Sequence, residues 1–341
     1  MEINLISKYR NQIFGISIIS IIIFHFTEDY YSAFKAGAIA KNLVAHSYFR
    51  MIGSIGVEIF IFLSGFGLYY SYSKNKNIGS FYKKRMKRLL IPYIPVGIIV
   101  WGIWDFIIKD QGLIGFIKDL TFVSLFTEGQ KGIWFIGVMI VLYILFPILY
   151  KIIDSKKPVI NTCLFTVIFF IIMYFFKMIL PTIYNNTEIA LMRVPIFVIG
   201  ILFGWMAQRK VKISKIAVAL IIIIGPTLKI VRELMDFSIF ANRIICTLYG
   251  ISAILLICII LEVINWTTFN KCMAKVGDYS LELYMTHVGI RKIVKSFGAD
   301  TYKVSIYLMV VVGMIISSIC LHKITTPLIK GKKATDTTKS S

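Results

Sequence analysis

Three ionisable side chains of complementary chemistry lie in or beside the apolar segments of this sequence. His25 closes a long apolar run, Glu58 interrupts a second and Arg193 precedes a third. An ionisable group inside a bilayer is unfavourable unless it is paired or hydrated, so such residues are functional candidates. A carboxylate beside a histidine orients its tautomer and raises its basicity, as a general base requires. We therefore predict that Glu58 pairs with His25 or with Arg193, and that the imidazole accepts protons.

The neighbours of His25 also allow a purely structural role. Glu28 and Asp29 follow it within about one helical turn, and an interfacial histidine that hydrogen-bonds to a nearby carboxylate needs no catalytic function. Trp134 opens another apolar run on the same predicted side as His25, Glu58 and Arg193. The shared depth of these four residues favours a functional site.

A basic segment, residues 83–88, lies on the other predicted side of the membrane. Such a cluster is typical of an anchor against anionic lipid, and the alternative is a phosphate site. Arg10 faces the same side, fifteen residues before His25 in one apolar helix. At 1.5 Å per residue the two lie about 22 Å apart along the axis. Arg10 and His25 could therefore hold opposite ends of a long cofactor, with its phosphates at Arg10.

A further polar stripe follows residue 279. Ser280, Tyr284 and His287 are spaced to share one face of a helix, and Glu282 lies off that face. The stripe predicts either hydrogen-bonded helix packing or support of a site. His46 and His322 lie in or next to loops, and we predict no role for them.

Composition defines the elements that must position these residues. Hydrophobic residues make up 57% of the 341-residue chain, charged residues 16%, and the mean hydropathy is +0.79, which excludes a soluble protein. A bilayer core needs about 20 apolar residues per helix. We predict an all-α polytopic membrane protein with about ten transmembrane helices, near residues 11–26, 52–71, 90–109, 132–150, 158–178, 189–207, 214–231, 243–263, 279–296 and 303–322. Segment 113–126 is too short and too charged to cross, and we predict an interfacial or re-entrant piece.

The net charge is +21 because 38 Lys and Arg residues outnumber 17 Asp and Glu residues. Most of these cations flank the predicted spans. More of them fall on the side of the termini, which predicts a multi-pass cell-membrane protein with both termini cytoplasmic, although residues 291–303 are basic on the other side. No basic stripe with interleaved aromatic residues occurs, which excludes nucleic acid as a partner. The five cysteines are scattered, which argues against a disulfide framework or a structural zinc site. We expect one membrane domain, 1–329, followed by a polar cytoplasmic tail, 330–341.

Four motifs resemble those of the acyltransferase 3 family of bacterial membrane enzymes. The pattern G-x-x-G-V-x-x-F-x-x-x-S-G is matched by Gly53, Gly56, Val57, Phe60, Ser64 and Gly65. The small residues of this segment also predict a face on which another helix packs closely. The family's basic segment before the third span is matched by Phe81, Lys84, Arg85, Arg88, Pro92 and Tyr93. The element R-x-P-x-F-x-x-G is matched by Arg193, Pro195, Phe197 and Gly200, and S-x-E-x-Y-x-x-H by Ser280, Glu282, Tyr284 and His287.

The first span of the family is similar to R-x10-H, and this sequence departs from that pattern. His25 fits the histidine, but Phe14 occupies the arginine position, and the nearest arginine, Arg10, lies one helical turn earlier. Either Arg10 reaches up to take that role, or the cations of the 83–88 segment do. Family members often carry aspartate after Gly-Val, and Glu58 keeps that charge.

The resemblance implies an O-acyltransferase, commonly an acetyltransferase. The donor would be cytoplasmic acetyl-CoA or another acyl-CoA. The acceptor would be a hydroxyl of an extracytoplasmic surface polysaccharide or of its lipid-linked precursor. The enzyme would lie in the lipid bilayer and use no metal. It implies catalytic roles for His25, Glu58 and Arg193, with His25 as general base or as nucleophile. It implies donor binding by Arg10, Lys84, Arg85 and Arg88, and support by Trp134, Ser280, Glu282, Tyr284 and His287.

Two other functions remain open on the sequence. About ten helices with polar groups near mid-membrane also describe a transporter or a flippase for a surface-glycan precursor. A sensory or assembly module without turnover is the third reading. Counting O-acyl groups on surface polysaccharide distinguishes the three.

Overall fold

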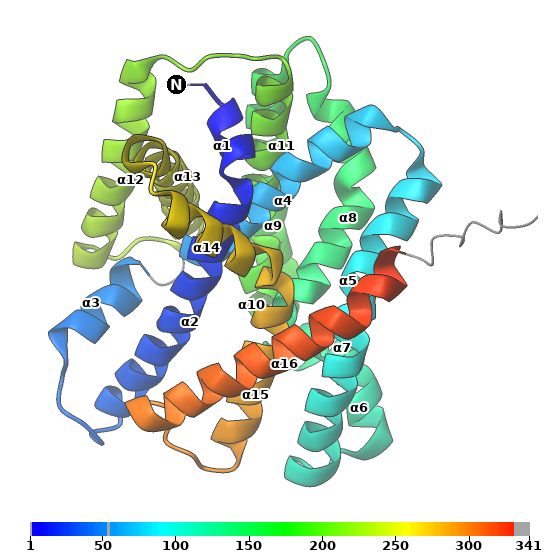
Figure 1. Ribbon diagram of the computed structural model, residues 1–341, viewed down its shortest axis with the longest axis vertical. Coiled ribbons are helices and arrows are strands. Elements are labelled where there is room, and N and C mark those ends of the chain that lie inside the picture. The colour runs from blue at the N-terminus through cyan, green and yellow to red at the C-terminus, as the bar shows by residue number, and fades with distance from the viewer. Residues whose placement is uncertain (1, 53–54, 331–341) are drawn as a thin grey trace, which may run out of the picture.

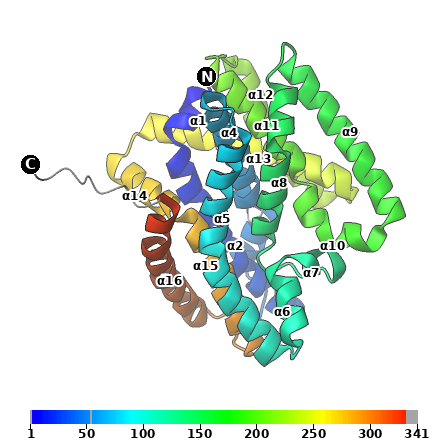
Figure 2. The ribbon, with the colours of Figure 1, turned by 90° about the vertical axis from the view of Figure 1, so that its right-hand side faces the viewer.

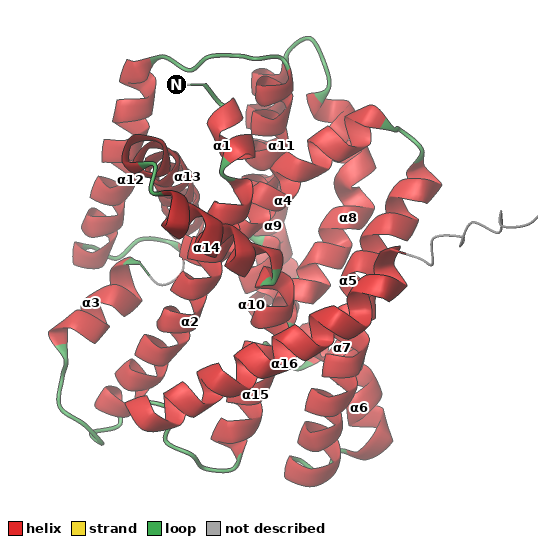
Figure 3. Ribbon diagram, viewed as in Figure 1, coloured by secondary structure: helices red, strands yellow, loops and turns green. Residues whose placement is uncertain are grey.

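The computed structural model describes residues 2–52 and 55–330, and helices make up almost all of that part of the chain (Figure 3). In chain order the helices are α1 (Asn4–Lys8), α2 (Arg10–Lys35), α3 (Leu43–Met51), α4 (Ile55–Lys74), α5 (Ile78–Gly102), the π-helix η1 (Ile103–Ile108), α6 (Gly112–Leu120), α7 (Val123–Thr127), α8 (Trp134–Ile153), α9 (Pro158–Ile179), α10 (Pro181–Leu191), α11 (Val194–Gln208), α12 (Lys215–Leu234), α13 (Ile239–Ile264), α14 (Thr267–Asp278), α15 (Ser280–Ser296) and α16 (Val304–Lys330). The all-α membrane fold is confirmed.

Helices occupy all ten predicted positions, but within residues 2–52 and 55–330 only eight helical stretches are long and apolar enough to cross a membrane. The other two are α12 and α15. Helix α12 carries Lys229, Arg232 and Glu233 in its last turns, and α15 has 17 residues with three cations near its end. Both helices contribute charged side chains to the interior.

The outermost helices expose apolar side chains, as contact with lipid requires. Figure 2 shows α9 at one edge of the bundle, and Figure 1 shows α16 across one face. Apolar side chains of α9 such as Leu164, Ile168 and Ile172 are more than half exposed. In contrast, α4 and α11 are largely buried at the centre.

Helix α2 is longer than predicted. The expected span ended at residue 26, and the predicted outer loop 27–51 instead contains nine further residues of α2 and the whole of α3. The charged pair Glu28 and Asp29 suggested a helix end. Both are paired with Arg291, so the helix continues through them. Segment 113–126, by contrast, forms the short helices α6 and α7 and does not cross, as predicted.

Glycine residues of the motifs allow close contact between α4 and α11. A methyl group on Gly65 would lie 2.2 Å from the carbonyl oxygen of Phe197, and one on Gly200 would lie 2.2 Å from that of Phe62. Such distances leave no room for a side chain, so these two motifs form one helix crossing. The prediction of a packing face is confirmed for Gly65, whereas Gly53 lies outside the described residues.

Candidate functional site

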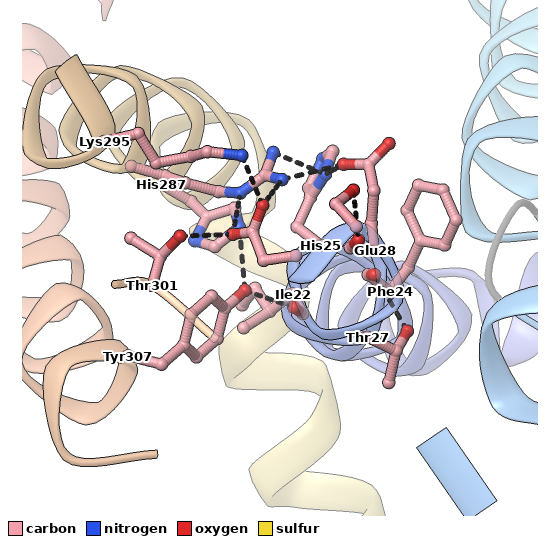
Figure 4. Close-up of polar contacts among 12 residues, drawn as sticks. Ile22, Phe24, His25, Thr27, Glu28, His287, Lys295, Thr301 and Tyr307 are labelled. Atoms are coloured by element: carbon pink, nitrogen blue, oxygen red, sulfur yellow. Dashed lines mark hydrogen bonds and ion pairs between the residues drawn. The ribbon is translucent and has the colours of Figure 1, made fainter. Parts of the chain in front are cut away.

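His25 lies on α2 and is surrounded by charged side chains from α2 and α15. Glu28 Oε2 is 3.1 Å from His25 Nδ1, and Arg291 Nη1 is 3.0 Å from the same nitrogen (Figure 4). The side chain of His25 remains 19% exposed. Because Glu28 lies three residues after His25, the α-helix itself brings the carboxylate to the ring.

Asp29 fixes the position of Arg291. The Arg291 guanidinium donates to both carboxylate oxygens of Asp29, at 2.8 and 2.5 Å. Lys295 and Thr301 donate to the same buried carboxylate at 2.6 and 2.7 Å (Figure 4). A bidentate pair with two further donors is strong and has one geometry. Asp29 therefore ties the end of α2 to the end of α15 and holds Arg291 against His25.

The two partners of His25 Nδ1 belong to different tautomers. Arginine only donates hydrogen bonds, so contact with Arg291 requires an unprotonated Nδ1 and places the proton on Nε2. Glu28 as a carboxylate only accepts, so contact with it requires Nδ1–H and leaves a lone pair on Nε2. The site thus accommodates both neutral forms of His25, and the form bonded to Glu28 makes Nε2 basic.

His287 on α15 lies beside His25, with 5.4 Å between the ring centroids. It is fully buried, and its Nε2 is 3.3 Å from the hydroxyl of Tyr307. That hydroxyl donates its only hydrogen to the carbonyl of Ile22, so it accepts from His287 Nε2–H. The lone pair of neutral His287 is therefore on Nδ1, which is buried and has no hydrogen-bond partner among the described residues.

Glu58 pairs with Arg193, which decides between the two partners considered for it. Arg193 Nε is 2.9 Å from Glu58 Oε1, and the two residues are 5% and 2% exposed. Arg193 also donates to the carbonyl of Ile189, and its guanidinium lies 5.0 Å from the ring centroid of Trp134. A buried pair covered by an aromatic face forms a second polar centre. The sequence alone had grouped these three residues with His25 in one site.

A row of aromatic rings runs between the Arg10 end and the α15 helix. Phe14 contacts Phe60 at 5.1 Å between centroids, Phe60 contacts Phe135 at 6.0 Å, and Phe135 contacts Tyr284 at 5.1 Å. Tyr284 lies one turn before His287 and interacts electrostatically with Arg193. Helix α15 therefore connects the His25 centre with the Glu58–Arg193 centre.

Arg10 begins α2 and gathers with two other arginines. Its guanidinium lies 5.2 Å from the ring centroid of Phe14, so the side chain does reach up by one turn. Arg85 and Arg88 interact electrostatically with it, and all three act on Tyr143. The Nε atoms of Arg10 and Arg85 are buried without a hydrogen-bond partner among the described residues. Clustered cations with free donors are suited to phosphate groups.

The remaining predicted residues are dispersed. Lys84 is exposed, outside the contacts that join the three arginines. Ser280 is buried at the start of α15. Glu282 is buried and receives a 2.8 Å contact from Nδ1 of His322, for which we predicted no role. Glu282 therefore joins α15 to α16, and no hydrogen bond or ion pair links Lys84, Ser280 or Glu282 to His25 in the described part of the chain.

Sequence reasoning missed Arg291 and Tyr307, and it considered Asp29 only as a carboxylate that could bond to His25. One signal was available: residues 291–303 are basic on the predicted outer side, where few cations are expected. The structure explains this excess, because Arg291 and Lys295 neutralise Asp29, and Lys303 pairs with Asp300. Cations that break the charge rule therefore indicated ion pairs, of which those with Asp29 involve a buried carboxylate.

Comparison with known proteins agrees with the motifs. Residues 15–323 match the sequence profile of the acyltransferase 3 family, described as an acyltransferase domain. No curated protein and no solved structure matches the chain significantly. The match covers every predicted site residue except Arg10. The chain is therefore a membrane protein that belongs to the acyltransferase 3 family.

Proposed function

We propose that this protein transfers an acyl group, commonly acetyl, from cytoplasmic acyl-CoA to a hydroxyl of an extracytoplasmic surface glycan. The observation that carries the proposal is the placement of His25 and Arg10 on one helix. A histidine with an accessible ring lies at one end, and a cluster of three arginines lies at the other, about 22 Å away. This separation suits a donor with phosphates at one end and a thioester at the other.

The residues at the Arg10 end fit the phosphates of the donor. Arg10, Arg85 and Arg88 supply charge-assisted hydrogen bonds, and the hydroxyl of Tyr143 lies among them. The aromatic row from Phe14 to Tyr284 offers an apolar path for the arm that carries the thioester. In this proposal both termini and the arginine cluster face the cytoplasm, as the charge distribution predicts.

Chemistry at His25 has two routes. In the direct route, Nε2 removes the hydroxyl proton while the oxygen attacks the thioester carbonyl, the C–S bond breaks, and the proton passes to the thiolate. In the covalent route, Nε2 attacks the thioester carbonyl, the C–S bond breaks, and the Nδ1 proton passes through Glu28 to the departing thiolate. The hydroxyl oxygen then attacks the acyl-imidazole, and its proton passes through Glu28 to Nδ1 as neutral imidazole leaves. Both need the tautomer in which Nδ1–H donates to Glu28.

The second polar centre has a supporting role in this proposal. Arg193 carries a positive charge held by Glu58 and Trp134, and Tyr284 connects it to the helix that holds His287. A fixed cation near the reacting carbonyl stabilises the oxyanion, or it positions the acceptor.

The decisive experiment counts O-acyl groups on the surface polysaccharide of a deletion strain. Complementation with the wild type should restore these groups, and complementation with an equally expressed His25→Ala variant should not. Glycan export that is lost without the protein and restored by both variants would identify a flippase instead. Equal acyl content in the deletion strain and the wild type would overturn the proposal.

Neutralising the arginine cluster should weaken donor binding. Arg85→Gln and Arg88→Gln each remove a charge-assisted bond, so the KM for acyl-CoA should rise roughly tenfold, with less change in kcat. Lys84→Gln should have a smaller effect because Lys84 lies outside the electrostatic contacts that join Arg10, Arg85 and Arg88. Exposed Lys87→Gln on the same helix is the matched control. The measurement is steady-state kinetics of purified protein, and an unchanged KM in both arginine variants would remove the cluster from the donor site.

A further inference from the structure

A further group of buried charges, separate from the His25 and Glu58–Arg193 centres, lies where η1, α6 and α15 meet. Asp105 is fully buried, and neither of its carboxylate oxygens has a hydrogen-bond partner among the described residues. Asp119 is 3% exposed, and its Oδ2 also lacks a partner within that part of the chain. Trp101 is 2% exposed, and its indole N–H lies near the hydroxyl of Tyr93 but makes no hydrogen bond of normal geometry within the described residues. Three buried polar side chains thus have unused hydrogen-bonding capacity at one place.

Local backbone geometry directs these groups toward one another. The π-helix η1 interrupts the end of α5 at residues 103–108 and places Asp105 on the buried side. Such π-helical turns often occur at functional sites. Asp105 Oδ1 would lie 3.4 Å from a methyl group on Gly115, so the carboxylate faces α6, and it interacts electrostatically with Asp119. Burial raises the pKa of the Asp119 carboxyl above its usual range.

Lys292 does not neutralise the two carboxylates through a direct ion pair. Its ammonium lies 3.2 Å from the ring centroid of Trp104 and donates to Gln130 Oε1 at 3.3 Å. Within the described residues no salt bridge joins it to Asp105 or Asp119, although it interacts electrostatically with both. The cation therefore rests on an aromatic face beside the carboxylates.

The unused groups together specify the chemistry of a ligand. Carboxylates accept hydrogen bonds, whereas the indole N–H of Trp101 and the ammonium of Lys292 donate them. A metal ion would satisfy only the carboxylates, and an anion would satisfy only the donors. A hydroxyl group both donates and accepts, and the apolar face of a sugar ring can pack on an indole. A polyhydroxylated ligand satisfies the whole set.

We propose that Asp105, Asp119, Trp101 and Lys292 form the subsite that binds the sugar acceptor. This inference rests on the proposed function and adds the acceptor side of the reaction. Lys292 directly follows Arg291 on α15, so one helix carries both a cation of the subsite and the guanidinium that contacts His25 Nδ1. Entry requires α6 to move from η1, and left-handed residues, Asp110 and Phe122, flank α6.

Isosteric variants of the carboxylates test the subsite. Asp105→Asn and Asp119→Asn keep the shape but remove the charge, so the KM for acceptor polysaccharide extracted from the deletion strain should rise roughly tenfold or more. The KM for acyl-CoA should remain unchanged. Glu128→Gln, in an exposed pair with Lys118, is the matched control. An unchanged acceptor KM in both variants, or an equal rise in the KM for acyl-CoA, would overturn the proposal.

A binding measurement separates this proposal from the proposed function. Titration of the purified full chain with the same polysaccharide, without acyl-CoA, should change the tryptophan fluorescence, and Trp101→Phe should reduce that change. A wild-type protein that binds the polysaccharide but transfers no acyl group to it would contradict only the proposed function. Absence of any fluorescence change in the wild type would contradict the subsite, even if the carboxylate variants did not fold.

Discussion

Replacing His25 by alanine is expected to lower kcat for acyl transfer by roughly 10²–10⁴-fold, with little change in the KM for acyl-CoA. The reason is positional, because His25 lies far along α2 from the arginine cluster and contributes the imidazole between Glu28 and Arg291. The measurement is steady-state release of CoA thiol by purified protein in detergent or vesicles. His46→Ala is the matched control, since His46 lies on α3 and contacts the ring of Tyr31 outside the site.

The same variant decides between the two chemical routes. Radiolabelled acyl-CoA without acceptor should leave label on the wild type and none on His25→Ala if the route is covalent. No label on either protein, with acceptor-dependent turnover in the wild type, identifies the direct route. Near-normal kcat in a well-folded His25→Ala protein would contradict both routes. Glu28→Gln should lower kcat as well, because an amide no longer enforces the tautomer with Nδ1–H.

Removing one partner of the buried Glu58–Arg193 pair is expected to destabilise the fold by about 3–5 kcal/mol, because an uncompensated charge remains in the interior. Glu58→Gln should therefore lower the thermal inactivation temperature sharply. The matched control is Glu188→Gln, which breaks the less buried pair with Arg243 and should have a smaller effect.

The double variant Glu58→Gln with Arg193→Met separates stability from function. It removes both charges and should regain much of the lost stability, since replacing a whole buried pair by neutral groups is often tolerated. Its acyl transfer should remain low if Arg193 stabilises the oxyanion. A stable double variant with normal activity would assign the pair to packing alone, and a stable Glu58→Gln single variant would contradict the expected cost.

The sequence allowed the fold to be predicted wherever the signal was local. Apolar runs of sufficient length located the helices, and small residues at Gly56 and Gly65 located close crossings. Helix α14 was missed because it is short and polar, and its contact with α2 depends on Gly15 and Gly277, far apart in the chain. The π-helix η1 was also missed, since a single inserted residue changes hydropathy very little.

The candidate site was less predictable because its contacts are long-range. The pair Glu58–Arg193 was among the alternatives, since only a few buried charges were available as partners. Arg291 could not be assigned to His25 from sequence, because the two are 266 residues apart and the charge of Arg291 fitted a surface loop. Tyr307 could not be assigned either, because a tyrosine in an apolar segment is common and does not indicate a contact with a distant histidine.

The row of aromatic rings from Phe14 through Phe60 and Phe135 to Tyr284 bears on permeability. Neighbouring ring centroids are 5.1 to 6.0 Å apart, so consecutive rings along the row are in contact. If the donor arm of the proposed function follows this row, it passes only as the rings rotate one after another. Such a route would deliver the thioester without a permanent aqueous pore, and the membrane would stay closed to protons and ions.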